Sequence, residues 1–150
     1  ASQNLTDAAS KKKPRMGRAA AINLIPSSTG AAIATVKALP QLEGKFDGIA
    51  IRTPVPVGSI SDITFLTSRK TSVEEINTIL LDESKTDRYN LVLAVSNEPL
   101  VSSDIIQSPL AAIVDLEMTR VVDGDLVKIL AWYDNEWGFT NQMIRQIQEI

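Results

Sequence analysis

Two short segments carry the side chains best suited to hold an anion. Ser27-Ser28-Thr29-Gly30 stands where a helix is expected to begin. Free backbone N–H groups and the positive end of the helix dipole favour a negative charge there, although such a stretch is more often a plain helix cap. Arg52 lies on a predicted strand, and its planar guanidinium could hold phosphate, but a solvent-facing arginine is the commoner reading.

A third candidate lies near the end of the chain. Asn135 directly follows a predicted strand and stands at the expected start of the last helix. Its side-chain amide can either cap that helix or pair with the amide of a ligand, and the local sequence favours the cap. Tyr133, with an expected outward face, could line the same pocket.

The basic run at residues 11–18 could attract phosphate groups or nucleic acid, but a solvated loop is the simpler interpretation. The run has no interleaved aromatic residues that could stack on bases. The formal net charge of the whole chain is −3. We therefore expect no nucleic-acid partner and no anionic membrane surface.

Residue types that are missing from the sequence exclude several chemistries. The chain contains no cysteine and no histidine, which excludes disulfides and thiolate metal sites and removes the commonest metal ligand. The usual partner of a serine or cysteine nucleophile is missing as well. We therefore expect no metal site and no catalytic nucleophile or base within these residues. The first residues do not look like a signal peptide and no apolar run could span a bilayer, so we expect a cytoplasmic protein.

Hydrophobic periodicity predicts one α+β domain over residues 1–150, with a mostly antiparallel or mixed sheet and about three helices packed on one face. The Asp123-Gly124 pair predicts a hairpin between strands at 113–122 and 126–133. Ser72 and Glu75 predict a capping box at the start of the second helix. The last helix places one apolar stripe, which we expect to pack in the core: Phe139, Met143, Ile147 and Ile150. The other predicted elements are helices at 29–39, 73–83 and 135–150 and strands at 49–52, 60–67 and 91–95.

Several motifs occur together in an order that is similar to one enzyme family. Residues 19–32 (AAAINLIPSSTGAA), 48–56 (GIAIRTPVP) and 132–138 (WYDNEWG) are the strongest of them, and residues 39–45 and 98–102 fit between them. Together they resemble the C-terminal catalytic domain of bacterial-type phosphorylating glyceraldehyde-3-phosphate dehydrogenases. The resemblance covers essentially the whole chain.

The resemblance implies roles for individual residues. Thr29 and Gly30 would bind the inorganic phosphate that attacks the acyl-enzyme, and Arg52 and Ser2 would serve the phosphate group of glyceraldehyde 3-phosphate. Asn135 would hydrogen-bond the carboxamide of the nicotinamide, with Tyr133 bordering that pocket. The cofactor of the full-length parent would be NAD or NADP, and the parent would be a homo-tetramer.

The same resemblance implies that the chemistry lies elsewhere in the parent. The chain would begin just after the family's histidine motif, so that it is truncated at its N-terminus and the dinucleotide-binding domain is absent. Met16 and Phe139 replace a common arginine and a usual tyrosine. We therefore expect the isolated chain to be inactive. The alternatives are a non-catalytic binding or assembly domain and a fragment of an erythrose-4-phosphate dehydrogenase.

Overall fold

The computed structural model describes residues 3–10 and 12–149. The chain forms two compact units, Ala1–Pro56 and Val57–Ile150. Ser2 and Ile150, both named in the sequence predictions, lie outside the described residues.

The N-terminal unit is built around a two-stranded antiparallel ribbon. Strands β1 (Ile25–Ser28) and β2 (Ile49–Arg52) pair with Ile25 opposite Arg52 and Ser28 opposite Ile49. Helix α1 (Ala31–Ala38) follows β1 after only two residues. The two short 3-10 helices of this unit are η1 (Pro14–Gly17) and η2 (Pro40–Leu42). The predicted helix at 29–39 is therefore present but begins two residues later.

The long N-terminal loop is tied to the start of β1 by the carboxylate of Asp7. Its Oδ1 accepts hydrogen bonds from the backbone N–H of Ala19 at 2.8 Å and from Nε of Arg18 at 3.2 Å. The pKa of Asp7 is lowered, first by the backbone hydrogen bond and then by the guanidinium. These bonds therefore hold Asp7 against the segment at Arg18 and Ala19.

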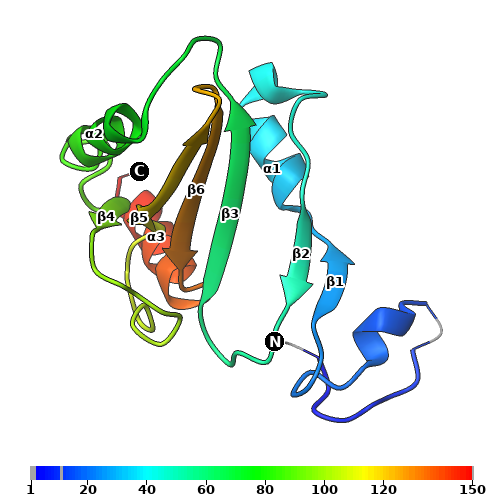
Figure 1. Cartoon of the computed structure of the whole chain (residues 1–150). Coiled ribbons are helices and arrows are strands. Elements are labelled where there is room, and N and C mark those ends of the chain that lie inside the picture. The colour runs from blue at the N-terminus through cyan, green and yellow to red at the C-terminus, as the bar shows by residue number, and fades with distance from the viewer. Residues whose placement is uncertain (1–2, 11, 150) are drawn as a thin grey trace. The chain divides into compact units, whose positions relative to one another are not determined.

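The C-terminal unit is a four-stranded mixed sheet with two helices. The strands lie in the order β3-β6-β5-β4, and Figure 1 shows β6 between β3 and β5. Only the β4–β5 pair is parallel. With α1, α2 and α3, the described residues form three α-helices and two sheets, and the predicted α+β class is confirmed. The elements of this unit are β3 (Ser59–Leu66), α2 (Val73–Glu83), β4 (Leu93–Ser96), β5 (Ala112–Val122), β6 (Leu126–Tyr133) and α3 (Trp137–Gln148).

The hairpin between β5 and β6 is confirmed with the predicted turn. Asp123 and Gly124 have φ angles of 49° and 73°, the left-handed values that such a turn requires and that Asp-Gly tolerates. Val122 pairs with Leu126 at the turn end of the hairpin. The register between β5 and β6 shifts between Asp115 and Arg120, so the pairing of β5 is irregular in its middle.

The core of this unit lies between the sheet and α2. Val114 and Leu116 of β5 and Ala131 of β6 are buried, and Leu80 of α2 packs against them. The helix is capped as predicted by Ser72, whose hydroxyl accepts from the backbone N–H of Glu75 at 3.2 Å.

The second bond of the predicted capping box, from the side chain of Glu75 back to the cap residue, is replaced by other contacts of Glu75. The Glu75 carboxylate accepts hydrogen bonds from the guanidinium of Arg69 and the hydroxyl of Thr71. These two donors, Arg69 first, lower the pKa of Glu75 to about 2. An arginine three residues before the cap offers a stronger partner to the carboxylate than the backbone N–H does.

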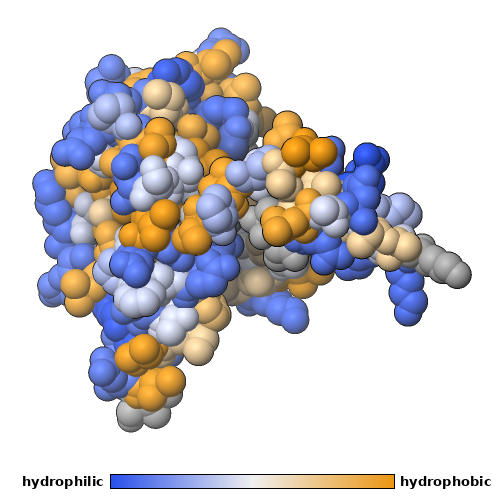
Figure 2. Space-filling view, turned by 90° about the horizontal axis from the view of Figure 1, so that it is seen from below, coloured by the Kyte–Doolittle hydropathy of each residue, from blue (hydrophilic) through white to orange (hydrophobic). Residues whose placement is uncertain are grey.

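The expectation that the apolar stripe of the last helix packs in the core is wrong. Phe139, Met143 and Ile147 on α3 are 65%, 48% and 67% exposed. Figure 2 shows hydrophobic side chains gathered in several clusters among hydrophilic ones on the face that it displays. Periodicity identified the stripe correctly but could not show what the stripe contacts. Among the described residues, no helix is long and apolar enough to cross a bilayer.

Candidate functional site

The junction between β1 and α1 places Thr29 and Gly30 at a helix N-terminus. The hydroxyl of Thr29 accepts a hydrogen bond from the backbone N–H of Ala31 at 3.1 Å. The interpretation of this segment as a helix cap is therefore correct for one N–H group. The next N–H groups of the first turn have no partner within the helix, because each helical N–H bonds to the carbonyl four residues before it and the first turn has no such carbonyl. This junction can therefore donate to an anion.

Neither the backbone conformation nor the packing around Gly30 requires a glycine at this position. Its φ is −83°, which any residue adopts, and a Cβ added there would meet nothing within 4 Å. The residue is also exposed. The space beside its backbone is open, as a group that approaches the N–H closely would need.

The ribbon brings Arg52 to the same face as Ser27. Ile25 pairs with Arg52 and alternate residues of a strand share a face, so Ser27 and Arg52 are diagonal neighbours. Oγ of Ser27 and Nε of Arg52 are both buried and have no hydrogen-bond partner among the described residues. An unsatisfied buried polar atom costs about 1–3 kcal/mol, so a polar group or water that reached these two atoms would be stabilised there.

The reading of Arg52 as a solvent-facing arginine does not describe its environment. The predicted alternation is present, but Ile49 and Ile51 on the opposite face are 73% and 55% exposed, whereas Arg52 is half-buried. From the sequence, Ser27 was named only as part of the segment at 27–30 and received no role of its own in binding phosphate. Its position two residues after the buried Ile25, on the same strand face, is the signal that could have identified it.

The second group of predicted residues lies in the C-terminal unit. Tyr133 ends β6 and pairs with Ser59, the first residue of β3. Asn135 is exposed, and its Oδ1 accepts a hydrogen bond from the hydroxyl of Ser59. This bond uses only the oxygen of the amide, so both N–H donors of Asn135 remain available for another group.

The interpretation of Asn135 as the cap of the last helix is wrong, because Asp134 has that role. Oδ1 of Asp134 accepts from the backbone N–H of Trp137 at 2.8 Å and of Glu136 at 3.1 Å. Its Oδ2 accepts from the backbone N–H of Gln107 at 2.9 Å. The charged carboxylate of Asp134, one residue further from the helix than Asn135, is a stronger acceptor for these backbone N–H groups than the neutral amide of Asn135.

Asp134 is buried, and its protonation is coupled to these contacts. Burial alone would raise the pKa of Asp134, but hydrogen bonds from three backbone N–H groups outweigh it and hold the pKa below its ordinary value of 3.8. The carboxylate therefore stays charged at neutral pH and fixes the segment that carries Asn135.

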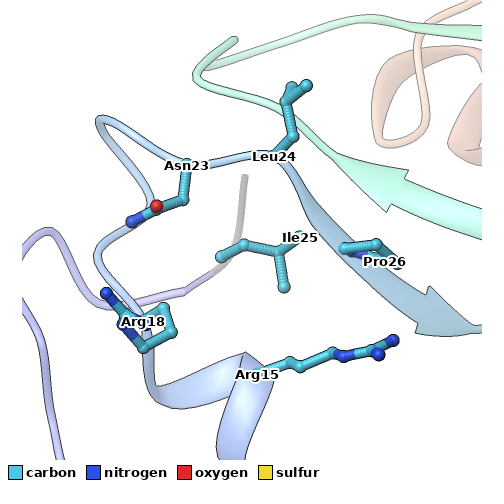
Figure 3. A pocket seen from close by; sticks show the side chains of 6 residues that line it. All are labelled: Arg15, Arg18, Asn23, Leu24, Ile25 and Pro26. Carbon is cyan, nitrogen blue, oxygen red and sulfur yellow. The ribbon is translucent and has the colours of Figure 1, made fainter.

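Figure 3 shows a shallow pocket of about 210 Å³ in the N-terminal unit. Arg15 and Arg18 border it on one side, and residues 23–26 form the other. Arg18 is already paired with Asp7. The pocket does not include Thr29, Gly30 or Arg52, so the sequence-predicted residues form a separate surface of the same unit. Among the described residues, no cluster of three or more carboxylates, histidines or cysteines could hold a metal ion.

Comparisons with known proteins agree on one family. Residues 1–135 match the family described as "Glyceraldehyde 3-phosphate dehydrogenase, C-terminal domain". The chain is 46% identical over 130 residues to a glyceraldehyde-3-phosphate dehydrogenase of Zymomonas mobilis, a match that covers 87% of the chain and 39% of the relative. It is 44% identical over 142 residues to the same enzyme of Mycobacterium bovis, which covers 95% of the chain and 41% of the relative. The chain thus spans about two-fifths of the length of these relatives.

Proposed function

Because the chain belongs to the glyceraldehyde-3-phosphate dehydrogenase family, as its C-terminal domain, we propose that it supplies the phosphate sites and the nicotinamide-orienting side chains of such an enzyme. The observation that carries the proposal is the pair of buried, unpartnered atoms, Ser27 Oγ and Arg52 Nε, on the strands that lead to Thr29-Gly30. The whole enzyme, a cytoplasmic homo-tetramer, oxidises glyceraldehyde 3-phosphate with NAD or NADP and phosphate.

Phosphate is held by two kinds of donor in this proposal. Backbone N–H groups at Gly30 and the start of α1 approach one side of the anion through the open space beside the glycine. Arg52 and the hydroxyl of Ser27 provide charge and a further donor from the ribbon face. Ser2, which lies outside the described residues, completes the site for the phosphate of the substrate. Phosphate bound in this way is positioned to release an acyl group from a thioester on the rest of the enzyme.

Asn135 and Tyr133 form the proposed contact with the cofactor. A nicotinamide cofactor held by these residues would supply the hydride acceptor. The two free N–H donors of Asn135 fit the oxygen of a carboxamide, and Asp134 fixes the backbone at that residue. A fixed donor pair determines which face of a planar ring is presented to the substrate.

The dehydrogenase chemistry itself is assigned to the remaining part of the polypeptide. In this proposal residues 1–150 are the substrate-binding part, and the dinucleotide-binding domain with the nucleophile and the general base corresponds to the region of the relatives that lies outside the match. The many exposed apolar side chains also support an assembly role for the chain, which is the second candidate function.

Titration of the labelled chain with inorganic phosphate should move the amide resonances of Thr29, Gly30 and Ala31 before any others. A charge-assisted contact contributes about 1.5–3 kcal/mol, and two or three of them less the ordering costs imply affinity of roughly millimolar. Nuclear magnetic resonance on the isolated chain is the measurement. Arg52→Leu should abolish the movement and leave the circular dichroism spectrum unchanged.

Two matched variants sharpen this titration. Arg15→Leu removes a guanidinium from the shallow pocket of Figure 3 and should leave the shifts of Thr29 and Gly30 intact. Gly30→Ala should weaken phosphate binding at least tenfold while stability changes by less than about 0.5 kcal/mol, since nothing in the chain surrounds the added methyl group. If the largest shifts fall on residues 11–13, binding belongs to the basic loop and the assignment of this site fails.

The isolated chain should show no dehydrogenase activity at any pH. It has no thiol to form a thiohemiacetal and no imidazole to accept the proton. The measurement is the absorbance of reduced cofactor with the purified, metal-free chain, glyceraldehyde 3-phosphate, NAD or NADP and phosphate. Turnover above that of a sample without protein would contradict the proposed division of roles.

A further inference from the structure

Asp-Gly pairs occur twice in the chain, at Asp47-Gly48 and at Asp123-Gly124. In such a pair the backbone nitrogen of the glycine can attack the side-chain carboxyl of the aspartate, because no Cβ shields that nitrogen. Ring closure requires rotation about the Cα–C bond of the aspartate until the nitrogen lies beside the carboxyl carbon. The two pairs differ in how far the fold permits this rotation.

The first pair lies in the segment that leads into β2. Oδ1 of Asp47 accepts a hydrogen bond from the backbone N–H of Gly48 at 2.7 Å, so the carboxyl is already folded over the nitrogen that would attack it. Both residues are exposed, and they belong to no helix or strand. A Cβ added at Gly48 would meet nothing within 4 Å, so no neighbouring atom obstructs the approach. Among the described residues, the carboxylate of Asp47 has no ion-pair partner that would hold it away.

The second pair is held in the hairpin turn between β5 and β6. Asp123 and Gly124 have the left-handed φ angles of 49° and 73°. Nζ of Lys70 donates to the carbonyl oxygen of Asp123, and the backbone N–H of Thr71 donates to that of Gly124 at 2.7 Å. Rotation at Asp123 would break these bonds. Exposure alone does not separate the pairs, because the side chain of Asp123 is 92% exposed.

We propose that Asp47-Gly48 is a site of spontaneous succinimide and isoaspartate formation in the folded chain. The nitrogen of Gly48 forms a bond to Cγ of Asp47, and the bond from Cγ to one carboxyl oxygen breaks. That oxygen leaves as water, with the proton of the N–H and the proton of the carboxyl group. Water then opens the five-membered ring. Breaking the bond from the nitrogen to Cγ restores aspartate, whereas breaking the bond from the nitrogen to the backbone carbonyl carbon gives isoaspartate.

Isoaspartate lengthens the backbone by one carbon directly before β2. The first pair of the ribbon joins Ile49 to Ser28, so the extra atom enters next to the strand that carries Arg52. The chemistry uses only Asp47, Gly48 and water, and no oxidant or cofactor takes part. The inference therefore does not depend on the proposed phosphate or cofactor sites.

The test uses the 150-residue chain, incubated for weeks at neutral pH and then digested with trypsin. Cleavage after lysine and arginine places each pair in a short peptide of its own, residues 46–52 and 121–128. Electron-transfer fragmentation distinguishes isoaspartate from aspartate in both peptides, and a succinimide is seen as the loss of one water. We expect isoaspartate to accumulate at least about tenfold faster at Asp47 than at Asp123, because only the second pair must first break hydrogen bonds. In concentrated urea the two rates should become similar.

Variants at the first pair complete the design. Gly48→Ala should slow the reaction at Asp47 about tenfold or more by shielding the nitrogen, while the fold has room for the methyl group. Asp47→Glu, which would need a six-membered ring, is the matched control and should stop the reaction. Asp47→Asn passes through the same ring with loss of ammonia and should form isoaspartate faster. Equal rates at Asp47 and Asp123 in the folded chain would overturn the proposal, as would isoaspartate at Asp47 that forms only in urea.

Discussion

Replacing Asp134 by alanine is expected to lower the free energy of unfolding of the C-terminal unit by about 3 kcal/mol. The substitution leaves three backbone donors, at Gln107, Glu136 and Trp137, without their acceptor in a buried position. It also releases Gln107 from the contact that holds it at a φ of 65°. Urea unfolding followed by tryptophan fluorescence is the measurement, because both tryptophans, Trp132 and Trp137, flank this residue.

The pH dependence of that difference has a definite sign. Since the folded-state pKa of Asp134 lies below its ordinary 3.8, the charged form stabilises the fold at neutral pH. This contribution is lost as the pH falls through 3.8 toward the folded-state pKa. The gap between the wild type and Asp134→Asn should therefore be largest near pH 7 and shrink as the pH falls below 3.8. A gap that widens in acid would contradict the role assigned to the carboxylate.

Asp62 provides the control for this prediction. It is also an aspartate of the C-terminal unit, but it is half exposed and paired with Lys128 at 2.7 Å on the sheet surface. Exposed ion pairs contribute about 0–1 kcal/mol. Asp62→Ala should therefore cost far less than Asp134→Ala in the same assay.

Replacing Gly138 by alanine is expected to destabilise the C-terminal unit by about 2–3 kcal/mol. Alanine is the better helix former by about 1 kcal/mol, but its methyl group would lie 2.5 Å from the carbonyl oxygen of Leu110. Backbone cannot yield as a flexible side chain can, so α3 must move away from the loop and stretch the hydrogen bonds from Gln142 to the carbonyl oxygens of Pro109 and Leu91. The melting temperature and the midpoint of urea unfolding both report the change.

Gly48→Ala is the matched substitution, because a Cβ at Gly48 meets nothing within 4 Å. It should change the free energy of unfolding by less than about 0.5 kcal/mol. A neutral result for Gly138→Ala would mean that the close approach of α3 to the loop is not maintained in solution.

Local chemistry predicted the elements well but not their surroundings. The Asp123-Gly124 turn could be identified because few residues tolerate two left-handed φ angles in succession. The helix cap at Ser72 followed from a hydroxyl three residues before a backbone donor. Each of these features depends on residues that are close in the sequence.

The errors have the opposite origin. The stripe of Phe139 and Met143 was assigned to the core because periodicity shows which side chains share a face and not what lies against that face. The local sequence favours Asn135 over Asp134 as the cap because it does not show the third donor that Asp134 gains at Gln107, 27 residues away. The half-buried environment of Arg52 likewise depends on strand pairing, which the sequence of one strand does not reveal.

The hydrogen bond between Ser59 and Asn135 has a consequence for the entropy of ligand binding. An asparagine amide free in solvent samples several rotamers and two opposite orientations, and a ligand that selects one of them loses part of its affinity to ordering. Here the hydroxyl of a residue 76 positions away in the sequence has already selected the orientation in which the oxygen faces that hydroxyl. The ordering is completed when the sheet forms, so a carboxamide that meets Asn135 encounters two donors already aimed in one direction.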